Sequence, residues 1–140
     1  MLECLIVGDS IAVGTKMFMK HCADYAKGGI NSWQFNRMYK NKDLTARTLI
    51  ISLGSNDHKG VKTFDELFEL RQRVDADRVY WILPHGNLNA PQNLPIAEIQ
   101  RIVQEVADYY GDVVLPINRV QPDGIHPSWE GYKDIAKRTK

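Results

Sequence analysis

The stretch LIVGDSIAVG, residues 5–14, decides how this chain folds. Its apolar start, closed by Gly8, is typical of a strand buried within a sheet. A helix that begins at Ser10 would place this serine at the positive end of the helix, with its own N–H free to donate. Such a serine is either an ordinary helix N-cap or a nucleophile beside an oxyanion site. On this stretch alone the N-cap is the simpler interpretation, and the decision depends on residues further along the chain.

The composition is that of one ordinary soluble globular domain. The chain has 140 residues, of which 44% are hydrophobic and 25% are charged, and its formal net charge is +1. We therefore expect a single domain over residues 1–140 with one hydrophobic core. The near-neutral charge, without a basic stripe, predicts that nucleic acid is not a partner. The sequence carries no indication of the oligomeric state.

The N-terminal sequence and the two cysteines bear on the cellular compartment in which the protein works. The N-terminus lacks a basic region followed by an apolar core, and no apolar run is long enough to cross a bilayer. We therefore expect no membrane partner and, for the chain as encoded, a cytoplasmic location. Cys4 and Cys22 match no zinc or redox spacing. We expect each cysteine to be a small buried hydrophobic residue in a reducing compartment.

Strand-like and helix-like segments alternate along the whole chain. We expect strands at residues 5–8, 23–27, 49–54, 79–83 and 113–117, and helices at residues 11–22, 32–39, 63–74, 96–110 and from 128 into the basic tail. Apolar strands separated by single helices imply a parallel sheet that is covered on both faces. The predicted fold is therefore a three-layer α/β/α, flavodoxin-like domain with about five strands. Ligands of such sheets bind beyond the carboxyl ends of the strands.

Three polar clusters follow predicted strands, and together they contain the parts of a serine hydrolase. The clusters are Gly8-Asp9-Ser10, Gly54-Ser55-Asn56-Asp57 and Asp123-Gly124-Ile125-His126-Pro127. Ser10 can serve as the nucleophile and His126 as the base, because imidazole titrates near neutrality. Asp123 can orient the imidazole from three residues away, and the Asn56 side-chain amide can donate to an oxyanion. Each cluster also has a structural interpretation, since Asn56 could cap a helix and Asp123 could form a turn.

In order and spacing, the three clusters resemble the nucleophile, Gly-x-Asn-Asp and Asp-x-x-His blocks of the SGNH (GDSL-like) hydrolase family. The resemblance extends from near the start of the chain to near its end. It implies a serine hydrolase with an α/β fold that cleaves esters through an acyl-enzyme on Ser10, with His126 and Asp123 completing a triad. The chain has no Gly-x-Ser-x-Gly motif, which argues against the α/β-hydrolase family.

The glycine block of this family matches less well. The resemblance predicts Gly-x-x-Gly, with a backbone N–H of the second glycine donating to the oxyanion, whereas this chain has Gly28-Gly29-Ile30-Asn31-Ser32. A backbone donor survives the replacement of that glycine by Ser32 if the dihedral angles permit it. Either Gly29 or Ser32 can supply the donor, and we favour Gly29. The expected oxyanion hole therefore consists of Ser10, Gly29 and Asn56, with Ser32 as the alternative to Gly29.

Other histidines and tryptophans have less specific positions. Trp33 and Trp129 flank catalytic blocks, and His85 lies in the loop after the fourth strand, so these three are the candidates for substrate contact. His21 and His58 are expected at the surface or in loops. Trp81 lies in the middle of a strand and is expected in the core.

These residues predict a small serine esterase. Because a chain this short leaves little room for a lid or an acyl tunnel, we expect a small acyl group, such as O-acetyl, on a small-molecule or carbohydrate ester. The chemistry needs no metal and no organic cofactor. The alternatives are a carbohydrate-binding or structural module that keeps the fold without turnover, and an unrelated flavodoxin-like protein with chance motifs. The complete set of Ser, Asn, Asp and His argues against the first alternative, since binding alone does not require all four. The second alternative predicts that the protein has no ester turnover.

Overall fold

Ten elements alternate between strand and helix in the computed structural model, which describes all residues 1–140. The strands are β1 (Leu2–Gly8), β2 (Ala23–Ala26), β3 (Leu44–Ser52), β4 (Val74–Leu83) and β5 (Val113–Pro116). The helices are α1 (Ser10–Met17), α2 (Ser32–Met38), α3 (Thr63–Gln72), α4 (Ile96–Tyr110) and α5 (Trp129–Arg138). None of the five helices combines the length and the apolar character that a membrane crossing requires.

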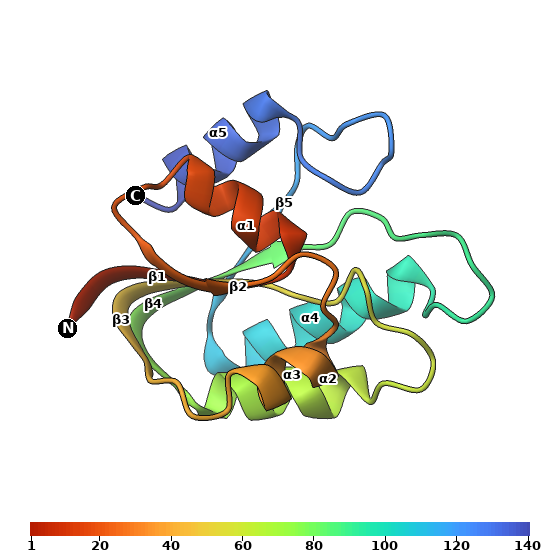
Figure 1. The fold of residues 1–140 in the computed structure, drawn as a ribbon, viewed down its shortest axis with the longest axis horizontal. Helices are drawn as coiled ribbons and strands as arrows, with labels where there is room; N and C mark the ends of the chain where they lie inside the picture. The colour runs from red at the N-terminus through yellow and green to blue at the C-terminus, as the bar shows by residue number, and fades with distance from the viewer.

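The five strands form one parallel sheet in the order β2-β1-β3-β4-β5. Helices α1 and α5 cover one face of this sheet, and α2, α3 and α4 cover the other (Figure 1). The strand order is the flavodoxin-like one, in which the chain reverses direction between β1 and β3. The predicted three-layer α/β/α architecture is therefore confirmed.

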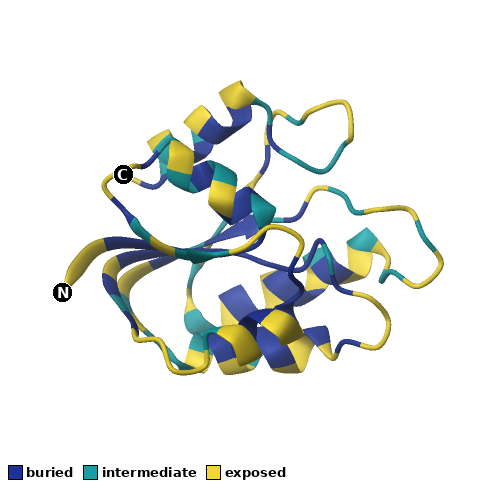
Figure 2. Cartoon of the chain, in the orientation of Figure 1, coloured by how far each residue is buried: buried dark blue, intermediate teal, exposed yellow.

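Two apolar clusters lie between the sheet and its helices. Figure 2 shows buried residues, in dark blue, on the strands and on the helices that cover them. The larger cluster has 18 buried residues, including Trp81, which is 1% exposed. The smaller cluster of 11 residues includes Ile11 of α1 and Ile135 of α5, and it therefore fixes these two helices against the sheet. Trp81 donates its Nε1 hydrogen to Asp112 Oδ2 at 2.9 Å, which satisfies its one polar atom. The prediction that Trp81 lies in the core is confirmed.

The turn from β1 into α1 depends on a glycine at its last strand position. Gly8 pairs with Ser52 of β3 and has a φ of 141°. A Cβ atom at this position would collide with the Ser52 carbonyl oxygen, so only glycine fits. The next residue, Asp9, donates its N–H to the same carbonyl at 3.0 Å. This close approach turns the chain into α1 at the carboxyl edge of the sheet.

Several element boundaries differ from the prediction. Strand β1 begins at Leu2 and β3 at Leu44, ahead of the expected residues 5 and 49, and β3 ends at Ser52. Helix α1 ends at Met17, before the expected end at residue 22, because tight turns follow in which Phe18 donates to the Thr15 carbonyl and Cys22 to that of Met19. Strand β4 begins at Val74, which was expected to close the preceding helix. Its first half carries charged residues because it lies near the rim of the sheet, where alternate side chains are exposed.

The cysteines also differ from the prediction. Cys4 and Cys22 are buried, as expected, but they form a disulfide, and neither is a separate hydrophobic residue. The cause is the strand register: Leu5 of β1 pairs with Ala23 of β2, so the residues just before them are neighbours, with Cα atoms 4.6 Å apart. A pairing of this kind depends on which strands become neighbours and cannot be obtained from the spacing of the cysteines.

Candidate active site

Ser10 is the first residue of α1, but it does not cap the helix. Asp9 is the N-cap: its Oδ1 accepts the Ile11 N–H at 3.0 Å and the Ser52 hydroxyl at 3.1 Å. The Ser10 hydroxyl is therefore free of a capping role, and its Oγ lies 2.8 Å from Nε2 of His126. The N-cap interpretation of Ser10 is wrong, because the preceding aspartate already satisfies the helix.

His126 is held by Asp123 in a short turn. Asp123 Oδ2 lies 2.7 Å from His126 Nδ1, and Oδ1 accepts the N–H groups of Ile125 and His126 at 2.8 and 3.0 Å. Gly124, with a φ of 69°, permits this tight turn. The hydrogen bond from His126, followed by those from the two backbone N–H groups, lowers the pKa of Asp123 to about 2. With Nδ1–H donating to this carboxylate, Nε2 is left to accept the Ser10 proton.

Asn56 has one amide hydrogen to spare. Its Nδ2 donates to the Ile30 carbonyl at 3.0 Å, which fixes the side chain to the glycine block. The second hydrogen on Nδ2 has no partner within the protein, and it can donate to an oxygen of a substrate. The hydrogen bond to Ile30 therefore orients the amide without using its full donor capacity.

The structure distinguishes between Gly29 and Ser32, the two residues of the glycine block that could donate a backbone N–H to the oxyanion. Ser32 donates its N–H to Asp57 Oδ1 at 2.9 Å and its hydroxyl to Oδ2 at 2.6 Å. Its N–H is therefore already used, and the alternative that placed Ser32 in the oxyanion hole does not fit this arrangement. Gly29, by contrast, is exposed with a φ of 81°, and its N–H makes no hydrogen bond within the protein. A Cβ on the adjacent Gly28 would lie 3.9 Å from the Ser10 Cβ, which places this turn beside the proposed nucleophile.

Two buried aspartates support the site, and sequence reasoning did not assign these roles to them. Asp57 is 0% exposed and also accepts the Thr63 hydroxyl at 2.7 Å, so it joins the starts of α2 and α3. Burial raises the pKa of Asp57, although its hydrogen bonds oppose this. Asp9 is 1% exposed, its Oδ2 has no partner, and burial raises its pKa to about 7. The capping role of Asp9 could have been predicted from its position just before a helix. Its burial could not, because no pattern in the neighbouring residues indicates it.

The three candidates for substrate contact lie in different surroundings. Nδ1 of His85 donates to the Gly124 carbonyl at 2.9 Å, so His85 braces the turn that carries His126. Trp129 is 73% exposed at the start of α5, and its ring and that of Phe18 pack in a T-shaped arrangement. Trp33 is 49% exposed, and the Arg37 guanidinium lies 4.9 Å from its ring centre. Both indole rings are accessible to a ligand.

The linked side chains of Ser10, His126 and Asp123 lie on an open part of the surface. None of the five larger pockets of the structure, of about 290 to 540 Å³, is lined by Ser10, Asn56 or His126. The site therefore has no deep tunnel for a long chain, and a large molecule can approach Ser10 from solvent.

Comparisons with known proteins identify the fold. No family model matches the chain, and no curated protein sequence matches it. Among solved structures, a GDSL-like lipase from Bacteroides thetaiotaomicron is 18% identical with a TM-score of 0.72, covering 99% of this chain and 85% of its own. An acetyl xylan esterase is 14% identical with a TM-score of 0.70, covering 96% of each chain. A catalytic mutant of an acetylxylan esterase from Geobacillus stearothermophilus is 13% identical with a TM-score of 0.65, covering 96% of this chain and 90% of its own.

These structures share the architecture of nearly the whole chain. Their sequence identity to it is low, so the likeness establishes the fold alone. The order of the blocks along the sequence and the strand order of the sheet agree with this likeness. The chain therefore has the three-layer fold of the GDSL-like hydrolases, and the resemblance that its sequence motifs indicated is confirmed at the level of the fold.

Proposed function

We propose that the protein is a serine esterase that removes a small acyl group through an acyl-enzyme on Ser10. The observation that carries this proposal is the continuous hydrogen-bonded chain from Ser10 through His126 to Asp123, with distances of 2.8 and 2.7 Å. A capping serine would not need an imidazole at its hydroxyl, nor a carboxylate on the far side of that imidazole. Nucleophilic catalysis requires both.

The reaction follows from these positions. As Ser10 Oγ attacks the ester carbonyl carbon, its proton passes to Nε2 of His126, and Asp123 stabilises the imidazolium that forms. His126 then returns the proton to the leaving alcohol, and the acyl group stays on Ser10. Water, activated by the same imidazole, releases the acid and restores the serine.

Three donors can hold the negative charge on the carbonyl oxygen in this mechanism. They are the backbone N–H of Ser10, the backbone N–H of Gly29 and the spare hydrogen of the Asn56 amide. The Ser10 N–H lies at the start of α1, where the helix dipole also favours negative charge. Gly29 and Asn56 are fixed relative to one another, because Asn56 Nδ2 donates to the carbonyl of the residue that follows Gly29.

The open site favours a small acyl group on a bulky polar alcohol. None of the five larger pockets begins at Ser10, where it could hold a long acyl chain, whereas the exposed rings of Trp129 and Trp33 offer apolar faces to the alcohol. Sugar rings pack on such faces through their C–H groups. Two of the similar structures are acetylxylan esterases, which supports O-acetyl groups on a carbohydrate as the substrate class.

A series of p-nitrophenyl esters with increasing acyl length, together with acetylated sugars, tests this proposal. We expect the wild-type protein to hydrolyse acetyl esters fastest, and Ser10→Ala to lose the activity while keeping its circular dichroism spectrum. A fluorophosphonate probe should label wild-type Ser10 and leave Ser10→Ala unlabelled. Activity that persists in Ser10→Ala would refute the nucleophile assignment. Binding of an acetylated sugar without turnover would favour the non-catalytic carbohydrate-binding or structural module.

A further inference from the structure

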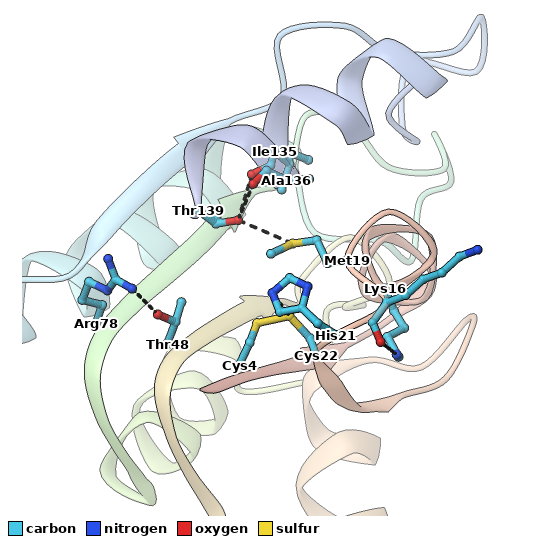
Figure 3. The surroundings of a disulfide bond; sticks show 11 residues. Cys4, Lys16, Met19, His21, Cys22, Thr48, Arg78, Ile135, Ala136 and Thr139 are labelled. Atoms are coloured by element: carbon cyan, nitrogen blue, oxygen red, sulfur yellow. Dashed lines mark hydrogen bonds between the residues drawn. A yellow bond between two sulfur atoms is a disulfide. The ribbon is translucent and has the colours of Figure 1, made fainter. Parts of the chain in front are cut away.

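A second cluster of reactive side chains lies at the edge of the sheet opposite Ser10. It consists of Cys4 near the start of β1 and of His21 and Cys22 in the turn before β2. The two sulfur atoms and one ring nitrogen of His21 all lie within 4.8 Å of one another. Figure 3 shows the His21 ring beside the two sulfur atoms, and His21 Nε2 is 3.6 Å from Cys22 Sγ. The proposed esterase mechanism uses none of these groups.

Cysteine thiolates and histidine imidazoles are common ligands of Zn²⁺ in proteins. Thiolates bind Zn²⁺ at about 2.3 Å and imidazole nitrogens at about 2.0–2.1 Å, in tetrahedral geometry. These bond lengths place a sulfur and a nitrogen ligand of one ion about 3.6 Å apart, and the observed distance between His21 Nε2 and Cys22 Sγ is 3.6 Å. The two atoms are therefore already spaced like two corners of a tetrahedral zinc site.

The surroundings leave room for an ion and for a fourth ligand. Cys4 and His21 line a cavity of about 290 Å³ that Met19 and Thr139 also line. Cys4 and Cys22 are 4% and 3% exposed, whereas His21 is exposed, so an ion would enter from the side of the histidine. With three protein ligands, the fourth position of the ion would face this cavity and could hold water.

We propose that Cys4, His21 and Cys22 form a Zn²⁺ site when the disulfide between the two cysteines is reduced. Disulfides persist in oxidising compartments, whereas paired cysteines in a reducing compartment more often bind metal. A phosphine reductant and one water convert the disulfide into two thiols and a phosphine oxide. Zn²⁺ then replaces the two thiol protons, which leave to solvent, and His21 donates the lone pair of Nε2. To admit the ion, the sulfur atoms separate to about 3.8 Å, the distance expected between two thiolates on one tetrahedral zinc.

The disulfide and the zinc ion would close the same loop by different chemistry. The cysteines are separated by 18 positions in the sequence, and this segment contains Ser10 and the whole of α1. Either crosslink therefore ties the start of β2 to β1, and hence the Gly28-Gly29 turn to the nucleophile. The site would hold this segment together in compartments where the disulfide cannot form.

Equilibrium dialysis of the untagged protein against Zn²⁺ under inert gas tests the proposal, with the oxidised and the phosphine-reduced forms of the same chain compared. We expect about one zinc per reduced chain and none per oxidised chain. Cys4→Ser and Cys22→Ser should each abolish binding by the reduced protein. His21→Ala should weaken it at least ~10-fold, since even loss of a group that only orients a ligand typically costs about that much. His58→Ala is the matched control, because it removes an exposed histidine elsewhere, and it should bind like wild type.

Cobalt provides a readout that is independent of variant folding. Reduced wild-type protein with Co²⁺ should show a thiolate-to-cobalt charge-transfer band and the intense visible bands of tetrahedral cobalt. Alkylation of the two thiols should remove both. The proposal is overturned if reduced wild-type protein binds no zinc, if binding is equal in His21→Ala and wild type, or if the cobalt spectrum lacks the thiolate band. Any of these results would leave the cysteines with the disulfide as their only role.

Discussion

Replacing Asp9 with asparagine should change how the stability of the protein depends on pH. Asp9 is fully buried, and burial raises its pKa from 3.8 to about 7. In the unfolded chain this carboxyl ionises near 3.8, so between pH 4 and 7 the folded state keeps a proton that the unfolded state has lost. The stability that the raised pKa contributes is therefore complete below pH 3.8 and is lost as the pH rises through about 7.

The magnitude follows from the two pKa values. Each pKa unit corresponds to about 1.4 kcal/mol, so the difference between 3.8 and about 7 corresponds to a loss of about 4 kcal/mol from pH 4 to pH 8. Because Asp9 is 1% exposed, solvent screening does not reduce this figure appreciably. Asparagine keeps the oxygen that caps α1, and it has no proton to lose in this range. Its amide nitrogen, at the position of the unpartnered Oδ2, costs about 1–3 kcal/mol at every pH.

Urea denaturation followed by circular dichroism at pH 4, 5, 6, 7 and 8 measures this difference. The free energy of unfolding of wild type minus that of Asp9→Asn should fall by about 4 kcal/mol across the series, while all other titrating groups cancel in the subtraction. Asp77→Asn, which removes an exposed carboxylate, is the control and should run parallel to wild type. Parallel curves for wild type and Asp9→Asn would refute the reasoning, since Asp9 would then ionise alike in the folded and unfolded states.

Three further outcomes follow from the same structure. Asp123→Asn should lower kcat by about 10⁴ with the fold intact, because an amide can favour the wrong His126 tautomer. The hydrogen bond from His126 lowers the pKa of Asp123 to about 2, so wild-type activity should show no limb from the ionisation of Asp123 down to about pH 3. Equal rates for the variant and the wild type across the pH series would remove Asp123 from the triad. Asn56→Ala should lower kcat by about 10²–10³ with little change in KM, and a raised KM with intact kcat would instead indicate a ground-state contact. Reduction of the Cys4–Cys22 disulfide in metal-free buffer should lower the free energy of unfolding by about 3 kcal/mol, the value expected for a loop of this length, and equal urea midpoints for both forms would contradict it.

Local pattern was enough to predict the outline of the site. The strand before Gly8 and the helix after it follow from an apolar run, a glycine and a new periodicity, all within ten residues. Because parallel strands direct their carboxyl ends to one edge, the clusters that contain Ser10, Asn56 and His126 were expected at that edge, and Ser10 and His126 do meet there. The identity of the glycine-block donor was not decided by the sequence, since Gly29 and Ser32 are equivalent as backbone groups.

By itself, therefore, the sequence determined the strands, the helices and the polar clusters at the strand ends, because each of these depends on neighbours within one element. The three-layer fold followed from the alternation of these elements, because apolar strands joined by single helices form a parallel sheet that is covered on both faces. Only the tertiary structure decided which polar groups are already hydrogen-bonded, which are buried and which cysteines pair. Asp57 occupies the Ser32 N–H, Asp9 lies in the core with a raised pKa, and Cys4 meets Cys22. These facts depend on strand register and on burial, which bring together residues 18 to 25 positions apart and remove water from them. No local window of the sequence contains that information.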